Sequence, residues 1–380
     1  MKKIFILSIL LLLLASLVSW AQDYDLDIDI DLSDSFETEE IKAPFSLYGY
    51  LVNYSIVNIY TDGSRIEDAD TGNTLYMRLK GDFEPEDALH FHFEAYYSGS
   101  TGNQSSSAVY ESYAIDHLWG SAAMGPLDLQ FGKMPIAWGT GYVFNPTART
   151  TSFAFMETVS EETPGTLGIA PSVQLGPGLA LQGYLAFQDK NHIAAAGANG
   201  DFNNLPFGIK LQATPGLFDF SAGFITEIIN DGSSYSRYYY LSSDFAGAVR
   251  DFGVYGEAAL RFPGGGSSLS LDYTGYNFPD SLELAAGFDY NISGIDVVTR
   301  VEYYHHGPGV SSKNDYDVSK VLSRELMLQG EEYIFLMLER VFFNYLTLTA
   351  GGLVNLNDFS AVIYPGISYE LYSNFLVSFG

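Results

Sequence analysis

Hydrophobic and polar positions alternate with a period of two over much of the chain beyond residue 44. This is the pattern of a β-strand, in which successive side chains point to opposite faces. No apolar run in this part approaches the roughly 20 residues of a membrane-spanning helix. The pattern predicts an all-β chain of about 16–18 strands, each of roughly 8–12 residues. The clearest run sets Leu282, Leu284, Ala286, Phe288, Tyr290 and Ile292 against Glu283, Ala285, Gly287, Asp289 and Asn291.

Turn signals separate these strands, and they alternate with longer polar stretches. The tight turns include Gly125-Pro126 and residues 176–178 and 214–216, whereas residues 98–107, 139–164, 189–204 and 305–320 are rich in Gly, Ser, Asn and Asp. Short turns on one side and long loops on the other are typical of an outer-membrane barrel. The prediction is a transmembrane antiparallel β-barrel over residues 44–380.

A secreted β-sandwich, jelly roll or β-helix also alternates, so the period alone does not decide between these folds. Three features favour the barrel: tyrosine and phenylalanine at strand ends, hairpins in nearly unbroken succession, and an export signal. The last residues agree, because Phe375, Val377 and Phe379 alternate as in the final strands of outer-membrane barrels, although Gly380 follows the last aromatic residue.

The first 21 residues have the features of a secretory signal peptide. Lys2 and Lys3 precede an apolar run from Ile4 to Leu14, and a small-x-small ending leads to Ala21. The apolar run is too short for a spanning anchor. We therefore expect cleavage before Gln22 and export of the chain.

Residues 22–43 form an acidic leader, with nine acidic and no basic residues between Gln22 and Glu40. The alternating aspartates suggest calcium, but an EF-hand loop counted from Asp23 would need Gly at Ile28 and Glu at Asp34. The motif is therefore absent. A solvated, partly disordered leader is favoured over a specific ion or partner site, which stays open.

Composition and charge narrow the function further. The 380 residues carry 18 Lys plus Arg against 46 Asp plus Glu, a formal charge of −28, which opposes binding to nucleic acid. The 28 Tyr and 27 Phe suit a β-rich protein. With no Cys, the chain has no disulfide, thiolate metal site or cysteine nucleophile.

One motif carries a resemblance to a known family. Residues 131–141 read Phe-Gly-Lys-Met-Pro-Ile-Ala-Trp-Gly-Thr-Gly, and residues 142–147 read Tyr-Val-Phe-Asn-Pro-Thr. This segment resembles bacterial outer-membrane porin-like barrels in which GK-x-P-x-x-WG-x-G and NPT follow a strand, and residues 330–358 resemble their closing hairpins. The resemblance implies a passive or weakly selective channel in the outer membrane of a diderm bacterium, in contact with lipid, a lipopolysaccharide-like surface and small solutes.

The same motif is a candidate pore constriction. Lys133 closes a strand, proline cannot continue the ladder, and three glycines let the backbone turn. A loop folded into the lumen and a loop at the barrel rim are equally compatible with this pattern. The candidate residues are Lys133, Pro135, Trp138, Gly139, Gly141, Asn145 and Pro146.

If the apolar faces meet lipid, a set of charged residues faces the lumen. Acidic side chains outnumber basic ones once the other inward acidic positions are counted, which favours cations or neutral solutes over anions. These further positions are Asp128, Asp219, Glu283, Asp296 and Glu370. For any single residue, an ion pair that braces the wall is the stronger interpretation. The pore-lining candidates are Arg78, Lys80, His90, His92, Glu94, Lys210, Glu227, Glu257, Arg261, Asp289, Arg300 and Glu302.

The sequence predicts no metal site, cofactor or catalytic residue. His90, His92 and Glu94 share one strand face, but ligands two positions apart lie about 7 Å from each other, too far to meet one ion on a straight strand. No histidine is followed by x-Ser, and no Gly-x-Ser-x-Gly elbow occurs.

The leading hypothesis is a porin-like outer-membrane channel for passive diffusion of small hydrophilic solutes. The alternative is a non-conducting barrel that acts as a surface scaffold, adhesin or envelope export component. Inward glycines favour an open lumen, while long polar loops suit surface contacts. Whether the chain forms a homo-oligomer is left open.

Overall fold

The computed structural model describes ten stretches of the chain. They are residues 45–61, 66–86, 88–101, 109–150, 164–188, 205–230, 235–264, 277–322, 328–372 and 375–379. All belong to the unit Pro44–Gly380, the second of two compact units. The predicted signal peptide 1–21 and acidic leader 22–43 lie outside the described residues.

The described residues form one antiparallel sheet of 17 strands. Each strand pairs with the next in chain order, from β1 with β2 to β16 with β17. This confirms the predicted all-β class with 16–18 strands. The strands are β1 (Phe45–Thr61), β2 (Ile66–Glu86), β3 (Leu89–Thr101), β4 (Val109–Met124), β5 (Leu127–Met134), β6 (Thr166–Gly176), β7 (Leu179–Ala186), β8 (Phe207–Ala213), β9 (Phe218–Asn230), β10 (Tyr235–Val249), β11 (Phe252–Pro263), β12 (Leu282–Ile292), β13 (Val297–His306), β14 (Glu332–Phe342), β15 (Leu346–Asn355), β16 (Ala361–Tyr372) and β17 (Phe375–Phe379).

The predicted strand length of 8–12 residues is wrong for several strands, among them β4 with 16 residues and β10 with 15, and most of all for the first hairpin. β1 and β2 contain 17 and 21 residues and stay paired from Phe45 opposite Phe83 to Thr61 opposite Ile66. Polar residues such as Asp68 and Asp70 belong to this ladder. Backbone hydrogen bonds hold a hairpin together whatever its side-chain pattern, so the alternation ends before the strands do.

Short and long connections alternate along the sheet. β4–β5, β6–β7, β10–β11 and β14–β15 are joined by tight turns, whereas β5–β6, β7–β8, β11–β12 and β13–β14 are joined by long segments. The short helices α2 (Phe278–Ser281), η2 (Lys313–Asp315) and α3 (Val318–Leu322) all lie in long connections. None of the helices in the described part is long and apolar enough to cross a membrane.

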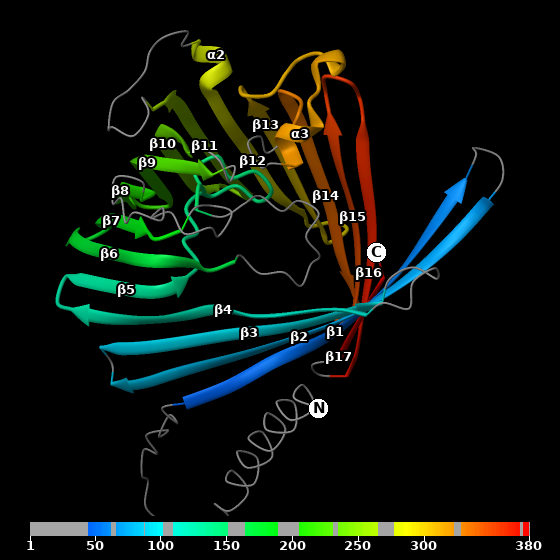
Figure 1. Cartoon of the computed structure of the whole chain (residues 1–380), viewed down its shortest axis with the longest axis horizontal. Coiled ribbons are helices and arrows are strands. Elements are labelled where there is room, and N and C mark those ends of the chain that lie inside the picture. Colours follow the sequence, from blue (N-terminus) through cyan, green and yellow to red (C-terminus); the bar gives the residue numbers. More distant parts are fainter. Residues whose placement is uncertain are drawn as a thin grey trace, which may run out of the picture. The chain divides into compact units, whose positions relative to one another are not determined.

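The sheet curls into a barrel, and residues 135–150 of the connection between β5 and β6 lie on its inner side (Figure 1). Backbone atoms of this segment contact Glu257 on β11 and Glu302 on β13, while Gly165 at the far end of the connection contacts Asp116 on β4. A flat sheet could not bring strands so far apart in pairing order onto one short segment.

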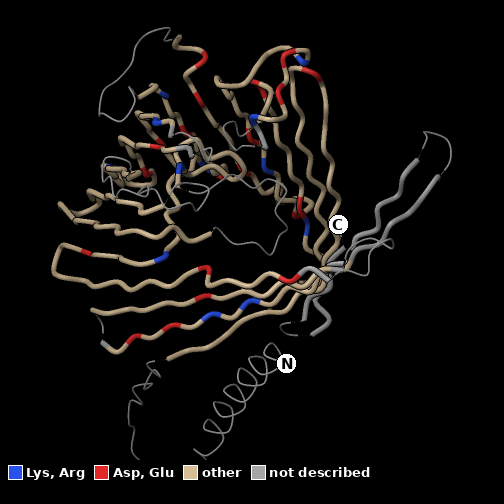
Figure 2. The backbone as a smooth tube through the Cα atoms, in the orientation of Figure 1, with Lys and Arg blue, Asp and Glu red and all other residues tan. Residues whose placement is uncertain are grey.

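The two faces of the sheet have inverted chemistry. On β14 the inward Phe335 is fully buried and the outward Leu336 is 44% exposed. Other strands of the sheet bury charged side chains, among them Arg78 on β2, Glu94 on β3 and Glu302 on β13. Figure 2 shows no charged residue along the middle of β14 and β15. A soluble sandwich would bury the apolar face, so this exposed apolar surface excludes that alternative for the described sheet.

Aromatic side chains follow the strand ends near the short turns. Phe252 and Tyr290 stack with ring centroids 4.5 Å apart, and Tyr345 meets Tyr369 edge-on at 5.3 Å. Phe343, in the same β14–β15 turn as Tyr345, is 74% exposed. Such a row at one end of an apolar surface is the arrangement of a membrane-interface girdle.

Candidate functional site: a segment that crosses the barrel interior

Residues 135–150 form the inner segment, which leaves β5 after Met134 and runs over the inner face of the sheet. Pro135 lacks the backbone N–H that would continue the ladder, so β5 ends there. Ile136 is buried among Tyr184, Ile225 and Tyr240, which lie on three different strands. The segment thus crosses the interior instead of starting an excursion at the rim.

Glu302 is the first anchor of the inner segment. Its carboxylate accepts the backbone N–H groups of Tyr142 at 2.7 Å and Phe144 at 2.5 Å, and that of Val143 at 3.1 Å. The Tyr255 hydroxyl donates to it at 2.9 Å. Successive backbone N–H groups can form a concave site that binds an anion. Here the three consecutive amides surround the carboxylate of Glu302, which belongs to the barrel wall.

Glu257 is the second anchor, two strands away on β11. It accepts the N–H of Thr140, the N–H of Gly141 at 2.5 Å and the hydroxyl of Thr147 at 2.8 Å. Gly139 has φ +107°, and a Cβ there would lie 2.6 Å from a Glu257 carboxylate oxygen. The chain approaches the wall this closely because residue 139 has no side chain.

Glu283, on the strand between these two, holds the end of the inner segment. Arg149 donates to it at 2.7 Å, and the Tyr304 hydroxyl donates at 2.8 Å. The Arg149 guanidinium also lies 4.1 Å from the centre of the Tyr240 ring. Both partners of the ion pair are buried, so breaking it would leave a charge without a partner in the interior.

Apolar contacts fix the middle of the inner segment. Phe144 is fully buried and stacks on Tyr304 with centroids 4.5 Å apart and planes at 9°. It belongs to a cluster with Phe335 and Leu353 from neighbouring strands. Trp138 packs edge-on against Tyr184 at 4.8 Å, with the Lys210 ammonium 5.1 Å from its ring centre.

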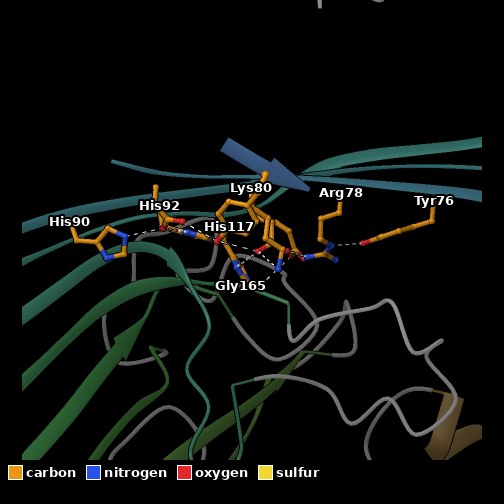
Figure 3. Close-up of polar contacts among 11 residues, drawn as sticks. Tyr76, Arg78, Lys80, His90, His92, His117 and Gly165 are labelled. Atoms are coloured by element: carbon orange, nitrogen blue, oxygen red, sulfur yellow. Dashed lines mark hydrogen bonds and ion pairs between the residues drawn. The ribbon is translucent and has the colours of Figure 1, made fainter. Parts of the chain in front are cut away.

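A second set of polar side chains, which we call the β2–β4 row, lines the opposite wall (Figure 3). Arg78 pairs with Glu94 and, at 2.9 Å, with Asp116. His117 lies 3.1 Å from Glu94, and Lys80 lies 3.6 Å from it. In Figure 3 the row runs from His90 through His92 and His117 to Arg78 and Tyr76.

A β-bulge explains why two consecutive residues of β4 join this row. The register shifts so that Glu94 pairs with His117 and Ala95 with Ile115, which leaves Asp116 without a partner residue. Both Asp116 and His117 are buried on the inner side. Bulges reorient side chains in this way, and strict alternation would have sent one of the two outward.

The predicted site residues fall into separate groups in the structure. Arg78, Lys80, His92 and Glu94 lie in the β2–β4 row, and His90 joins its end. Glu257, Glu302 and Lys210 lie against the inner segment, as does Arg300, whose guanidinium is 3.8 Å from the Tyr142 ring centre. The others have wall partners: Glu227 with Tyr240, Arg261 over Tyr238, and Asp289 at 3.7 Å from Arg300.

Among the constriction candidates, Lys133 is the one that does not belong to the inner segment. Its ammonium donates to the Ile115 carbonyl of β4 at 2.8 Å. Pro135, Trp138, Gly139, Gly141, Asn145 and Pro146 all lie within residues 135–150. The sequence reasoning missed Asp82, Asp116, His117 and Arg149, because their roles depend on cross-strand register, a bulge and a long-range ion pair.

Two groups in the described residues have the ligand types and spacing for a metal ion. One is Asp82, His90 and His92, and the other is His92, Glu94 and His117. The sequence-based trio of His90, His92 and Glu94 does not converge on one point. In each group the structure replaces one member with a residue from a neighbouring strand.

The geometry defines a class: an antiparallel meander barrel with an apolar exterior, a charged interior and a loop folded across that interior. No protein-family model matches the chain, and no curated protein matches its sequence. Among solved structures, the chain is similar to Salmonella typhi OmpF in complex with daunomycin, at 11% identity and TM-score 0.46, over 82% of this chain and 90% of that one. It is also similar to a triple mutant of Rhodopseudomonas blastica porin, at 12% identity and TM-score 0.43, over 86% and 99%. Because these TM-scores lie below 0.5, the fold assignment depends on the pairing and burial of this chain's own strands.

Proposed function

We propose that the chain is an outer-membrane channel through which small hydrophilic solutes diffuse passively. The observation that carries the proposal is the inverted chemistry of the sheet, with buried charges inside and exposed Leu, Ile and Phe outside. A bilayer is the solvent that such an exterior needs, and a closed sheet is one of the two structures that can span it. The proposal involves no catalytic step and no cofactor.

The inner segment is the proposed constriction. It occupies part of the lumen and is held by Glu257 and Glu302 through neutral backbone amides. Because amides carry no net charge, their hydrogen bonds to Glu302 add no positive charge in the narrow region, which leaves the negative potential of an ionised carboxylate there. That potential supports passage of cations and neutral solutes over anions.

The inner segment also supports a second candidate, a barrel that does not conduct. Its three buried carboxylate anchors and two apolar clusters fix it firmly across the interior. A barrel closed in this way would serve as a surface scaffold, adhesin or export component. A measurement of ion conduction distinguishes the channel from the closed barrel directly.

The deciding measurement is the current through single copies of the folded chain in a planar bilayer under a salt gradient. We expect steady ohmic steps with a reversal potential of cation sign. Replacing Lys210 with Met removes a positive charge beside the inner segment and should move the reversal potential further in that direction.

The matched control is Arg250→Gln in the exposed turn between β10 and β11, which should leave the reversal potential unchanged. The fold of the protein is verified by its heat-dependent electrophoretic mobility. If folded protein passes no current, the channel proposal is contradicted and the closed barrel is supported.

A further inference from the structure

We propose that Asp82, His90 and His92 form a binding site for a divalent transition-metal ion, with Zn²⁺ as the fitting case, on the inner wall of the barrel. The three residues offer one carboxylate oxygen and two imidazole nitrogens. All three ligand atoms lie within 4.8 Å of one another. Two imidazoles and a carboxylate are a ligand set that binds zinc with a fourth position left open.

The atoms already converge on a single point. His90 Nε2 lies 2.9 Å and His92 Nδ1 lies 2.7 Å from the same oxygen, Oδ1 of Asp82. In a tetrahedral zinc site with bonds of about 2.0 Å, neighbouring ligand atoms are about 3.3 Å apart. Opening each contact by about half an ångström, which side-chain rotation can supply, therefore makes room for the ion.

The register between strands explains why this site is not visible in the sequence of any single strand. Asp82 on β2 stands directly opposite His92 on β3, and Trp119 on β4 stands opposite His92 on its other side. The Trp119 ring lies 5.0 Å from that of His90 and 5.4 Å from that of His92. This packing holds both imidazoles toward Asp82, so the sites of the nitrogens are fixed before an ion arrives.

Hydrogen-bonding groups behind His92 and Asp82 hold these ligands in the way that is common around bound metal ions. Nε2 of His92 lies 3.5 Å from Glu94, and the Tyr48 hydroxyl donates to the second oxygen of Asp82 at 2.9 Å. A carboxylate behind a ligating histidine fixes the tautomer with its hydrogen on Nε2, which leaves the Nδ1 lone pair for the ion. A hydroxyl on Oδ2 leaves Oδ1 for the ion in the same way.

The neighbouring group of His92, Glu94 and His117 fits a cation less well. Glu94 is paired with the buried Arg78 and lies 3.6 Å from Lys80, so a divalent ion there would face two positive charges. Asp82, by contrast, has no Lys or Arg among its described ion-pair partners. The side chains of His90 and Asp82 are 32% and 21% exposed, which gives an ion access from the lumen.

The test is Zn²⁺ binding to the full chain folded in detergent micelles and purified without a polyhistidine tag. Competition with a chromophoric chelator gives the affinity, and the visible absorption of bound Co²⁺ reports tetrahedral geometry. We expect one ion per chain, and His90→Ala and Asp82→Asn should each raise the Kd at least about tenfold. No ion current is measured, so failure here is separate from failure of the channel proposal.

His305→Ala is the matched control. His305 lies 2.9 Å from Glu332, but no third ligand joins this pair among the described residues. The control should bind Zn²⁺ as the parent chain does, with the fold of every variant checked by electrophoretic mobility. The proposal is wrong if the parent chain does not bind Zn²⁺, if His90→Ala binds it unchanged, or if His117→Ala weakens binding while Asp82→Asn does not.

Discussion

Replacing Glu302 with Ala should release the inner segment from the wall. The substitution removes the acceptor of the backbone N–H groups of Tyr142, Val143 and Phe144 and of the Tyr255 hydroxyl. A hydrogen bond to a charged group contributes about 1.5–3 kcal/mol, and buried donors left without a partner add to the loss. A loss of about 3 kcal/mol raises the ratio of released to attached segment more than a hundredfold.

Thiol labelling measures this release directly, because the chain contains no Cys. A Val143→Cys variant places a single reporter at a half-buried position in the inner segment. Its labelling rate should rise in proportion to the released population when Glu302→Ala is added. In the planar bilayer, the same substitution should increase the single-channel conductance and its fluctuations if the inner segment is the constriction proposed above.

Glu332→Ala provides a matched control for this experiment. Glu332 is also a strand carboxylate with a tyrosine and a histidine as partners, but its described contacts are to Tyr303 and His305 rather than to the inner segment. The labelling rate at residue 143 should not change in this variant. Equal labelling of the parent and the Glu302→Ala chains would show that the contacts to Glu257 and Glu283 and the apolar packing hold the segment without Glu302.

The strands were predictable because their two faces lie in different environments, which produces an alternation of apolar and polar residues along the sequence. Leu282, Leu284 and Phe288 alternate with Glu283 and Asp289 since the outward-facing and inward-facing positions of this sheet differ in polarity. The long connections were predictable for a similar reason, because Gly, Ser and Asn accumulate where no ladder constrains the backbone. These signals need only a few consecutive residues.

The contacts of the candidate site join residues far apart in the sequence, and no local sequence pattern indicates them. Glu302 and Phe144 are separated by 158 positions, and nothing near either one marks them as partners. Asp82 and His92 meet through the register of two strands, and His117 faces inward through a bulge. The sequence could therefore list inward charges such as Glu257 and Glu302, yet not which backbone amides they would hold.

Replacing Leu336 with Arg should destabilise the folded chain by about 2–4 kcal/mol if the exterior faces a bilayer. Leu336 lies near the middle of β14, a strand of 11 residues, and it is 44% exposed in the absence of lipid. An arginine there would place a charge close to the bilayer midplane. In water the same exposed site would tolerate the change within about 0.5 kcal/mol. Denaturant titration in lipid vesicles, followed by electrophoretic mobility, measures the difference.

Leu356→Arg is the matched control for Leu336→Arg. It separates the effect of the position of the charge in the bilayer from the effect of losing an exposed leucine. Leu356 is exposed to a similar degree, 39%, but it lies in the connection between β15 and β16. A charge at such a boundary should change the free energy of unfolding by about 0–1 kcal/mol. If both variants lose the same small amount, the exterior does not face hydrocarbon. A large loss confined to Leu336→Arg would mean that the apolar face is solvated by lipid, which is the condition for the charged interior to line a passage through a membrane.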